Sequence, residues 1–256
     1  YFAAYFQLLR KNEIKKREKI NFTVPTGNFG NILAAYYAYK MGLPVNKLIC
    51  ASNENKVLTE FLETGIYNIN RDFKKTMSPS MDILISSNLE RFLFEITDHN
   101  SKKIITWYNQ LKKDGKFKID SNTLEKIKKI FHGEYAKEQE VKENIKNTYF
   151  NYNYLIDPHT AVGISSFKKY IKNKSNYKKT IINSTANPYK FSSSVLKSLG
   201  SNVHDEDEYK VVAKLNKLTN MKVHRGINSL KEKKIIQKRK CQVSSVEEEI
   251  KDILKV

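Results

Sequence analysis

One stretch near the start of this chain constrains its fold more than any other: a strand pattern, a glycine-containing turn, a helix pattern and a second strand pattern. The strand patterns are residues 20–24 and 47–51, and the helix pattern is 32–40. Gly42 and Pro44 end the helix, since glycine suits the position after a helix and proline cannot continue one. A strand, a helix and a strand in so short a span form a βαβ unit with parallel strands. We therefore predict an α/β fold with an open, mostly parallel sheet and helices on both faces.

The turn between the first strand and the helix has the composition of an anion-binding loop. Residues 25–31 read Pro-Thr-Gly-Asn-Phe-Gly-Asn. A loop that leads into a helix N-terminus presents free backbone N–H groups and the positive end of the helix dipole to one point. Gly27 and Gly30 have no Cβ, so a phosphate can approach the backbone and positive φ angles are allowed. An ordinary turn, with Asn28 tolerating a left-handed conformation, is the competing interpretation.

The charge of the chain raises nucleic-acid binding as a candidate function. Its 256 residues carry 46 Lys and Arg against 27 Asp and Glu, a formal net charge of +19. The lysines are spread along the whole chain with many Asn, Ile and Tyr, and no helix-turn-helix, zinc-finger or RNP-type motif accompanies them. We expect no specific nucleic-acid partner, and attraction to polyanions that is lost at moderate salt.

Two other classes are also disfavoured. No apolar run approaches the roughly 18 residues that a membrane span needs, so we expect no membrane partner. Cys50 and Cys241 are the only cysteines, too few for a disulfide framework, which favours the cytoplasm. No metal site is expected, because the histidines lack ligand-like spacing; four of them stand in charged contexts, namely His99, His132, His204 and His224.

Four segments together resemble one enzyme family. They read V-P-T-G-N-F-G-N at 24–31, S-P-S-M-D-I at 78–83, D-P-H-T-A-V-G at 157–163 and T-A-N-P-Y-K-F at 185–191. In this order and spacing they are similar to the carboxyl-terminal half of threonine synthase, a pyridoxal-phosphate (PLP) enzyme of fold type II. S-N-L-E-R-F at 87–92 and residues 227–241 fit the same family.

The resemblance implies conversion of O-phospho-L-homoserine and water to L-threonine and phosphate, in threonine biosynthesis, with PLP as cofactor. It implies that the backbone of the glycine loop holds the cofactor phosphate and that a neutral threonine hydroxyl meets the pyridine nitrogen, which moderates the electron sink. The cofactor-binding residues would be Gly27, Asn28, Phe29, Gly30, Asn31 and Thr185. The substrate-site candidates are Ser80, Asp82, Asn88, Arg91 and His159.

Several of these residues have ordinary structural interpretations that stay open. Thr185 could cap a turn at the end of a strand. Asp157 could be a helix N-cap with His159 hydrogen-bonded beside it, the interpretation that the sequence favours over proton transfer. Arg91 could pair with Glu95 one turn along a helix.

The chain departs from the family pattern in two places. Asn187 stands where the family motif has a histidine, and an amide cannot titrate near neutral pH. The family's Schiff-base lysine lies in an upstream F-K-D motif followed by S-G-D-T-G, and neither motif occurs in these 256 residues. We therefore expect no catalytic lysine in this chain, a partner domain that is missing from it, and no turnover by the chain alone.

The expected organisation is an α/β enzyme domain at 1–225 and a basic carboxyl-terminal tail at 226–256. Within the domain, residues 98–148 are charged and are expected to form a helical insertion of two or three surface helices. The first residue, a tyrosine, suggests that the chain begins inside a longer protein. Two alternative functions stay open: a non-catalytic module that binds a phosphate ligand on the same fold, and another fold type II lyase. The oligomeric state is open.

Overall fold

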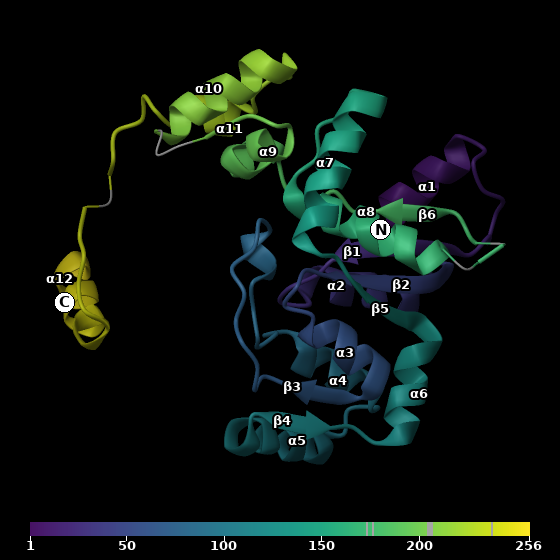
Figure 1. The fold of residues 1–256 in the computed structure, drawn as a ribbon. Helices are drawn as coiled ribbons and strands as arrows, with labels where there is room; N and C mark the ends of the chain where they lie inside the picture. Colours follow the sequence, from purple (N-terminus) through teal and green to yellow (C-terminus); the bar gives the residue numbers. More distant parts are fainter. Residues whose placement is uncertain (173, 176, 204–206, 237) are drawn as a thin grey trace. The chain divides into compact units, whose positions relative to one another are not determined.

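The computed structural model describes residues 1–172, 174–175, 177–203, 207–236 and 238–256. The chain divides into two compact units, Tyr1–Lys222 and Val223–Val256. The ribbon of each unit is drawn in Figure 1.

A four-stranded parallel sheet organises the first unit (Figure 1). Its strands are β1 (Ile20–Pro25), β2 (Val45–Ser52), β5 (Phe131–Tyr135) and β6 (Thr180–Ile182), in the order β5-β2-β1-β6. β1 lies between β2 and β6 and pairs with both in parallel register. Two short strands, β3 (Ile66–Asn68) and β4 (Lys116–Lys118), form a separate antiparallel pair. The predicted α/β fold with a parallel sheet is confirmed.

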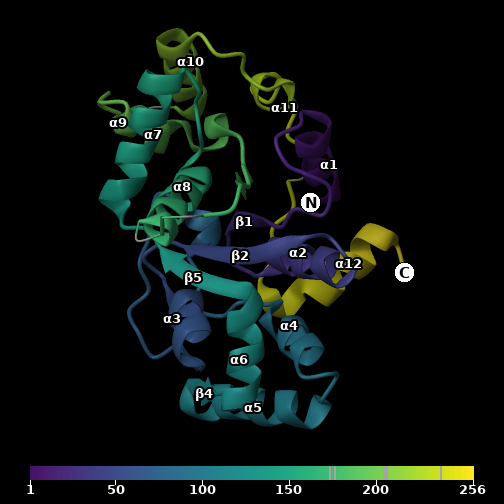
Figure 2. The same ribbon diagram turned by 90° about the vertical axis from the view of Figure 1, so that its right-hand side faces the viewer.

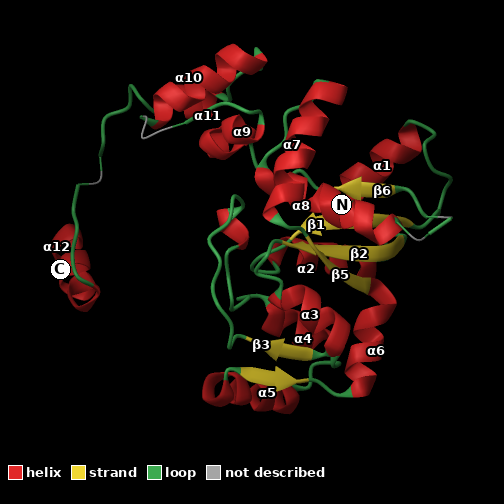
Figure 3. Cartoon of the chain, in the orientation of Figure 1, coloured by secondary structure: helices red, strands yellow, loops and turns green. Residues whose placement is uncertain are grey.

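Helices cover both faces of this sheet. Figures 1 and 2 show α8 on one side and α3, α4 and α6 on the other, and Figure 3 distinguishes the helices from the strands. The helices of the first unit are α1 (Phe2–Arg10), α2 (Gly30–Lys40), α3 (Val57–Thr64), α4 (Leu89–Ile96), α5 (Ser101–Asp114), α6 (Ser121–Ile130), α7 (Glu138–Tyr152), α8 (Pro158–Ile171), α9 (Ser192–Ser198) and α10 (Glu208–Thr219). The second unit contains α11 (Arg225–Asn228) and α12 (Val246–Leu254).

The core follows from the alternation of side chains along the strands. Phe22 and Val24 of β1 are fully buried in the main hydrophobic cluster, together with Leu48 and Cys50 of β2. The residues between them point to the opposite face, as the two-residue period of a strand requires; Thr23 is one of these and is also fully buried. A sheet covered on both sides buries nearly every residue of its central strands.

The predicted ends of two helices are confirmed. Helix α2 stops at Lys40, and Gly42 follows it with φ +99°, which only glycine adopts readily. Helix α8 begins at Pro158, and Asp157 accepts hydrogen bonds from the backbone N–H groups of His159 and Thr160. Residues 180–184 also carry a strand pattern in the sequence, but the strand formed there, β6, ends at Ile182.

The segment 98–148 differs from the expected helical insertion. It contains α5, α6 and most of α7, but β5 lies between the last two and pairs with β2 in the main sheet. The sequence of β5, F-H-G-E-Y, has no apolar run because β5 is an edge strand and only Phe131 is buried. Gly133 is needed there, since a Cβ would lie 2.9 Å from the backbone of Thr59 in α3.

Among the described residues, no helix combines the length and the apolar character needed to cross a bilayer. The boundary between the two units falls at Val223, close to the predicted start of the tail at 226. The roles given to these two parts of the chain stay predictions.

Candidate functional site

The glycine loop connects the end of β1 to the start of α2. Its unusual residue is Phe29, the N-cap of α2, which adopts the left-handed conformation with φ +62°. The sequence allowed positive φ at Gly27 and Gly30, but neither has it. Phe29 holds this conformation because its side chain is buried, with ring centroids 5.2 Å from Phe92 and 5.8 Å from Phe131.

The loop is fastened to the segment that follows η1 (Pro79–Met81), a short 3-10 helix. Ser86 Oγ donates to the Gly27 carbonyl at 2.9 Å, and the Asn88 side-chain amide donates to the Asn28 carbonyl at 2.7 Å. A Cβ on Gly27 would lie 2.6 Å from the Ser80 carbonyl oxygen. Gly27 is therefore required by the close approach of another backbone segment.

The backbone donors at the start of α2 have no hydrogen-bond partner within the described structure. The first i→i−4 hydrogen bond of the helix runs from Leu33 N to Phe29 O. The N–H groups of Gly30, Asn31 and Ile32 precede this bond and therefore have no partner within the helix. No side chain caps α2 in the described structure, and its first turn carries no acidic residue. These donors and the positive end of the helix dipole together favour an anion.

A pair of glycine variants tests this geometry. Gly27→Ala should lower the free energy of unfolding by about 1–3 kcal/mol, because the new methyl group displaces the Ser80 backbone. Gly30→Ala is the matched control: its Cβ would meet only the Asn88 side chain, at 3.4 Å, so a change within about 0.5 kcal/mol is expected. Urea unfolding followed by the fluorescence of Trp107, the only tryptophan, measures both. Equal destabilisation by the two changes would contradict the packing argument.

Asn31, the last residue of the loop, and Thr185 line one cavity. A cavity of about 330 Å³ is lined by Asn31 from the first turn of α2 and by Thr185, which follows β6. Thr185 is exposed, and its hydroxyl makes no hydrogen bond to any described residue. The alternative interpretation of Thr185 as a turn cap thus has no contact to support it. The cavity can take a molecule that carries an anion at one end and a hydrogen-bonding atom at the other.

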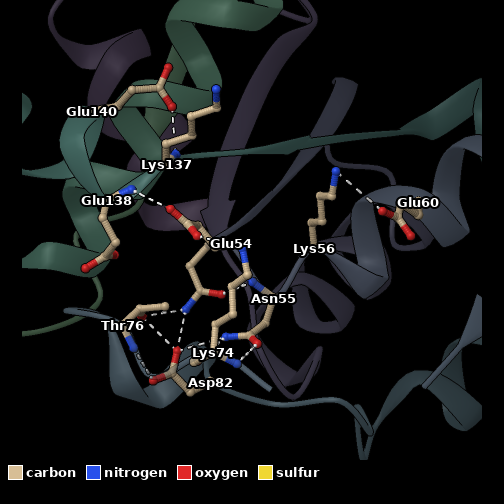
Figure 4. A network of polar contacts seen from close by, with 11 residues as sticks. Glu54, Asn55, Lys56, Glu60, Lys74, Thr76, Asp82, Lys137, Glu138 and Glu140 are labelled. Atoms are coloured by element: carbon tan, nitrogen blue, oxygen red, sulfur yellow. Dashed lines mark hydrogen bonds and ion pairs between the residues drawn. The ribbon is translucent and has the colours of Figure 1, made fainter. Parts of the chain in front are cut away.

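Asp82 is occupied by contacts within the protein (Figure 4). Its carboxylate accepts from the side-chain amides of Asn53 (2.7 Å) and Asn55 (3.1 Å). It also accepts from the backbone N–H of Thr76 (2.8 Å) and from the Thr76 hydroxyl (2.7 Å). These four bonds hold the segment before η1 against the end of β2. Asp82 has a structural function whatever else it does.

The other substrate-site candidates near the loop lie in different surroundings. Ser80 is exposed, and its carbonyl faces Gly27. The Asn88 side chain is used in the bond to the loop. Arg91 is exposed on α4, and Glu95, its expected partner, instead lies 3.3 Å from His99.

His159 belongs to a buried polar group at the start of α8. Its Nδ1 donates to Asp157 at 3.0 Å, and its ring lies 4.7 Å from that of Phe191. The Thr160 hydroxyl donates to Asp157 and lies 3.3 Å from the Ser184 hydroxyl, which is next to Thr185. Burial opposes the charge of Asp157, but the hydrogen bonds from His159 and Thr160 outweigh it and keep the pKa of that carboxyl below its usual value. The N-cap interpretation of Asp157 is confirmed.

Asn187 has a local structural contact. Its side-chain oxygen accepts from the backbone N–H of Tyr189 at 3.0 Å and caps η2 (Pro188–Phe191), a second 3-10 helix. An amide performs this capping without any need to titrate.

Two residues that line the cavity were not predicted from the sequence. Tyr1 and Asn183 both line it, and a hydrogen bond of 3.1 Å joins their side chains. No local pattern marks either residue, because Tyr1 lies in a helix pattern and Asn183 at the end of a strand pattern.

A metal centre has no candidate ligands in the part of the chain that the structure describes: no group of three or more His, Cys, Asp or Glu could hold an ion. His204, one of the histidines considered from the sequence, lies outside the described residues.

Comparison with known proteins connects this site to one family. A family model described as "Threonine synthase, C-terminal" matches residues 160–247. Threonine synthase of Saccharomyces cerevisiae is 38% identical over 237 residues, which cover 87% of this chain and 46% of that protein. Threonine synthase-like 1 of Homo sapiens is 39% identical over 200 residues, covering 77% of this chain and 26% of that protein.

The fold agrees with the sequence comparison. A crystal structure of PLP-bound threonine synthase from Brucella melitensis matches with a TM-score of 0.70 and 34% identity. The match covers 85% of this chain and 45% of that one. The chain therefore spans less than half the length of these relatives.

Proposed function

We propose that this chain is the carboxyl-terminal portion of a member of the threonine synthase family and forms the half of a PLP-dependent threonine synthase that holds the cofactor phosphate. The reaction would convert O-phospho-L-homoserine and water to L-threonine and phosphate. The observation that carries the proposal is a cavity lined by both Asn31 and Thr185.

The residues at this cavity fit PLP. The phosphate of the cofactor is an anion, and the uncapped N–H groups at the start of α2 offer it donors and the helix dipole. Thr185 offers a hydroxyl that no described residue uses, suited to the ring nitrogen. The cofactor-binding set we propose is Gly27, Asn28, Phe29, Gly30, Asn31 and Thr185.

The cofactor supplies an electron sink when bound. The work of this chain is to bind and to orient: the loop backbone anchors the phosphate, and Thr185 places a neutral hydroxyl at the ring. Ser80, Arg91 and His159 are proposed to face the substrate, while Asp82 and Asn88 act first by holding the loop and its neighbouring segment in place.

The lysine that would join the cofactor covalently has no match in these 256 residues. We propose that a segment bearing the F-K-D motif, in the manner of the family's amino-terminal domain, supplies it. We also propose a cytoplasmic location, since Cys50 is buried and both Cys50 and Cys241 are free thiols.

Binding and turnover measured on the 256-residue chain test the proposal. In phosphate-free buffer, equilibrium dialysis should detect PLP binding that inorganic phosphate competes away and pyridoxal, which lacks the phosphate, does not. No threonine should form from O-phosphohomoserine until the amino-terminal half of a related threonine synthase is added.

Two results would contradict the proposal. Absence of PLP binding would remove the cofactor site. Threonine formation by the chain alone, with one lysine labelled after borohydride reduction, would overturn the role given to the partner segment. PLP binding without turnover in the presence of that segment would favour a non-catalytic phosphate-binding module, and turnover of serine or threonine instead would favour another lyase of this fold.

A further inference from the structure

The hydroxyl of Tyr1 connects two elements that line the cavity. It donates to Asn31, lying 2.7 Å from the side-chain oxygen and 2.9 Å from the backbone carbonyl oxygen. It also accepts a hydrogen bond of 3.1 Å from the side-chain amide of Asn183. One hydroxyl thus joins the first turn of α2 to the chain just beyond β6.

The aromatic ring of Tyr1 is itself held in place. It packs edge-on against Phe22 of β1, with ring centroids 5.0 Å apart and an interplanar angle of 80°. Phe22 is fully buried in the core. Burial raises the pKa of Tyr1 above its usual value, so the hydroxyl stays protonated and keeps its donor. The position of the hydroxyl is therefore set by the core of the sheet.

The two partners of Tyr1 lead directly to the proposed cofactor contacts. Asn31 carries one of the uncapped N–H groups at the start of α2. Asn183 is anchored to β1 through its backbone N–H, which donates to Thr23 at 2.9 Å, and it precedes Thr185 by two residues. Tyr1, Asn31, Asn183 and Thr185 all line the same cavity.

We infer that Tyr1 is a positioning residue that sets the spacing between the phosphate-binding N–H groups of α2 and the hydroxyl of Thr185. A rigid ligand anchored at both ends is bound well only when the two anchors stand at the correct distance. The inference rests on the proposed function, because PLP is the ligand whose phosphate and ring nitrogen would use the two anchors.

The change Tyr1→Phe isolates the hydroxyl. It keeps the ring and its packing against Phe22, and it removes only the bonds to Asn31 and Asn183. Asn31 is exposed and Asn183 is partly exposed, so water can replace the lost partner and the unfolding midpoint should change little. The matched control is Tyr37→Phe, a tyrosine on α2 that is 39% exposed and does not line the cavity.

Three ligands separate spacing from anion binding: PLP, inorganic phosphate and pyridoxal, measured by equilibrium dialysis on the 256-residue chain. Tyr1→Phe should weaken PLP binding by about tenfold, the effect of losing a hydrogen bond of ordinary strength. The affinity for inorganic phosphate should stay within about twofold, because phosphate uses only one anchor. Tyr37→Phe should change neither.

The outcomes distinguish this inference from the proposed function. PLP bound equally by the wild type and Tyr1→Phe would overturn the inference and leave the proposed function standing. Equal weakening of PLP and phosphate would also overturn it, since the hydroxyl would then shape the anion loop alone. A wild-type chain that binds no PLP would overturn both. If Tyr1→Phe folds poorly, Asn183→Ala tests the same connection, because it removes the other partner of the Tyr1 hydroxyl. Asn183→Ala should then weaken PLP binding and leave the affinity for inorganic phosphate nearly unchanged.

Discussion

Replacing Phe29 with alanine is expected to lower the free energy of unfolding of the first unit by about 3–5 kcal/mol. The ring is 1% exposed and contacts Phe92 and Phe131, so its removal leaves a cavity at the point where the glycine loop meets the core. Urea unfolding followed by Trp107 fluorescence measures the change, because Trp107 is buried in the same hydrophobic cluster. Phe73→Ala, at a side chain 49% exposed, is the control and should cost less than about 1 kcal/mol.

The backbone at position 29 allows a sharper version of the same experiment. Phe29 has φ +62°, which disfavours every residue with a Cβ by about 1–2 kcal/mol relative to glycine. Phe29→Gly should therefore be more stable than Phe29→Ala, in the same direction as the preference for glycine over alanine at an N-cap and opposite to the order inside a helix. If Phe29→Ala proved more stable than Phe29→Gly, the left-handed conformation of residue 29 would be contradicted.

Replacing Asp157 with alanine is expected to cost about 3 kcal/mol. The carboxylate is fully buried and accepts from the backbone N–H groups of His159 and Thr160, from His159 Nδ1 and from the Thr160 hydroxyl. Its loss leaves buried donors without partners as well as an uncapped helix. The control is Asp120→Ala, an exposed N-cap on α6 that accepts from Thr123 and should cost only about 1 kcal/mol.

The contribution of Asp157 should also depend on pH. Its pKa in the folded protein lies below the value of about 3.9 for an unfolded aspartate, so the native state binds the proton less readily. The stabilisation is then complete above about pH 4 and is lost as the pH falls through the folded-state pKa. The difference in unfolding free energy between the wild type and Asp157→Ala should shrink over that range. If the difference in unfolding free energy stays constant down to about pH 3, the explanation by the Asp157 carboxylate is contradicted.

The variants at Phe29 and Asp157 also bear on the cofactor site. Phe29 sets the direction in which α2 leaves the loop, and the Asp157 group reaches Ser184, next to Thr185, through Thr160. Loss of PLP binding in parallel with loss of stability would therefore indicate that the site is disordered. Tyr1→Phe differs from both, because it is expected to reduce PLP binding with little change in stability.

The parts of the fold that depend on neighbouring residues could be predicted from the sequence. The strand patterns at 20–24 and 47–51, the glycine after α2 and the aspartate before α8 each act within a few residues of chain, so the βαβ unit and these helix ends were expected and found. Edge strand β5 was missed because a strand with one buried residue carries no periodic signal. It is recognised only by its pairing with β2.

The amino-acid sequence alone determined the type of fold and the place of the glycine-containing loop before α2, because strand patterns, helix caps and turn residues act over consecutive residues. Only the tertiary structure decided that Phe29 takes the left-handed conformation, that Asp82 is satisfied within the protein and that Tyr1 joins Asn31 to Asn183. Those results depend on packing between segments far apart in the chain. No spacing along the chain reports which distant side chains the folded core brings within hydrogen-bonding distance.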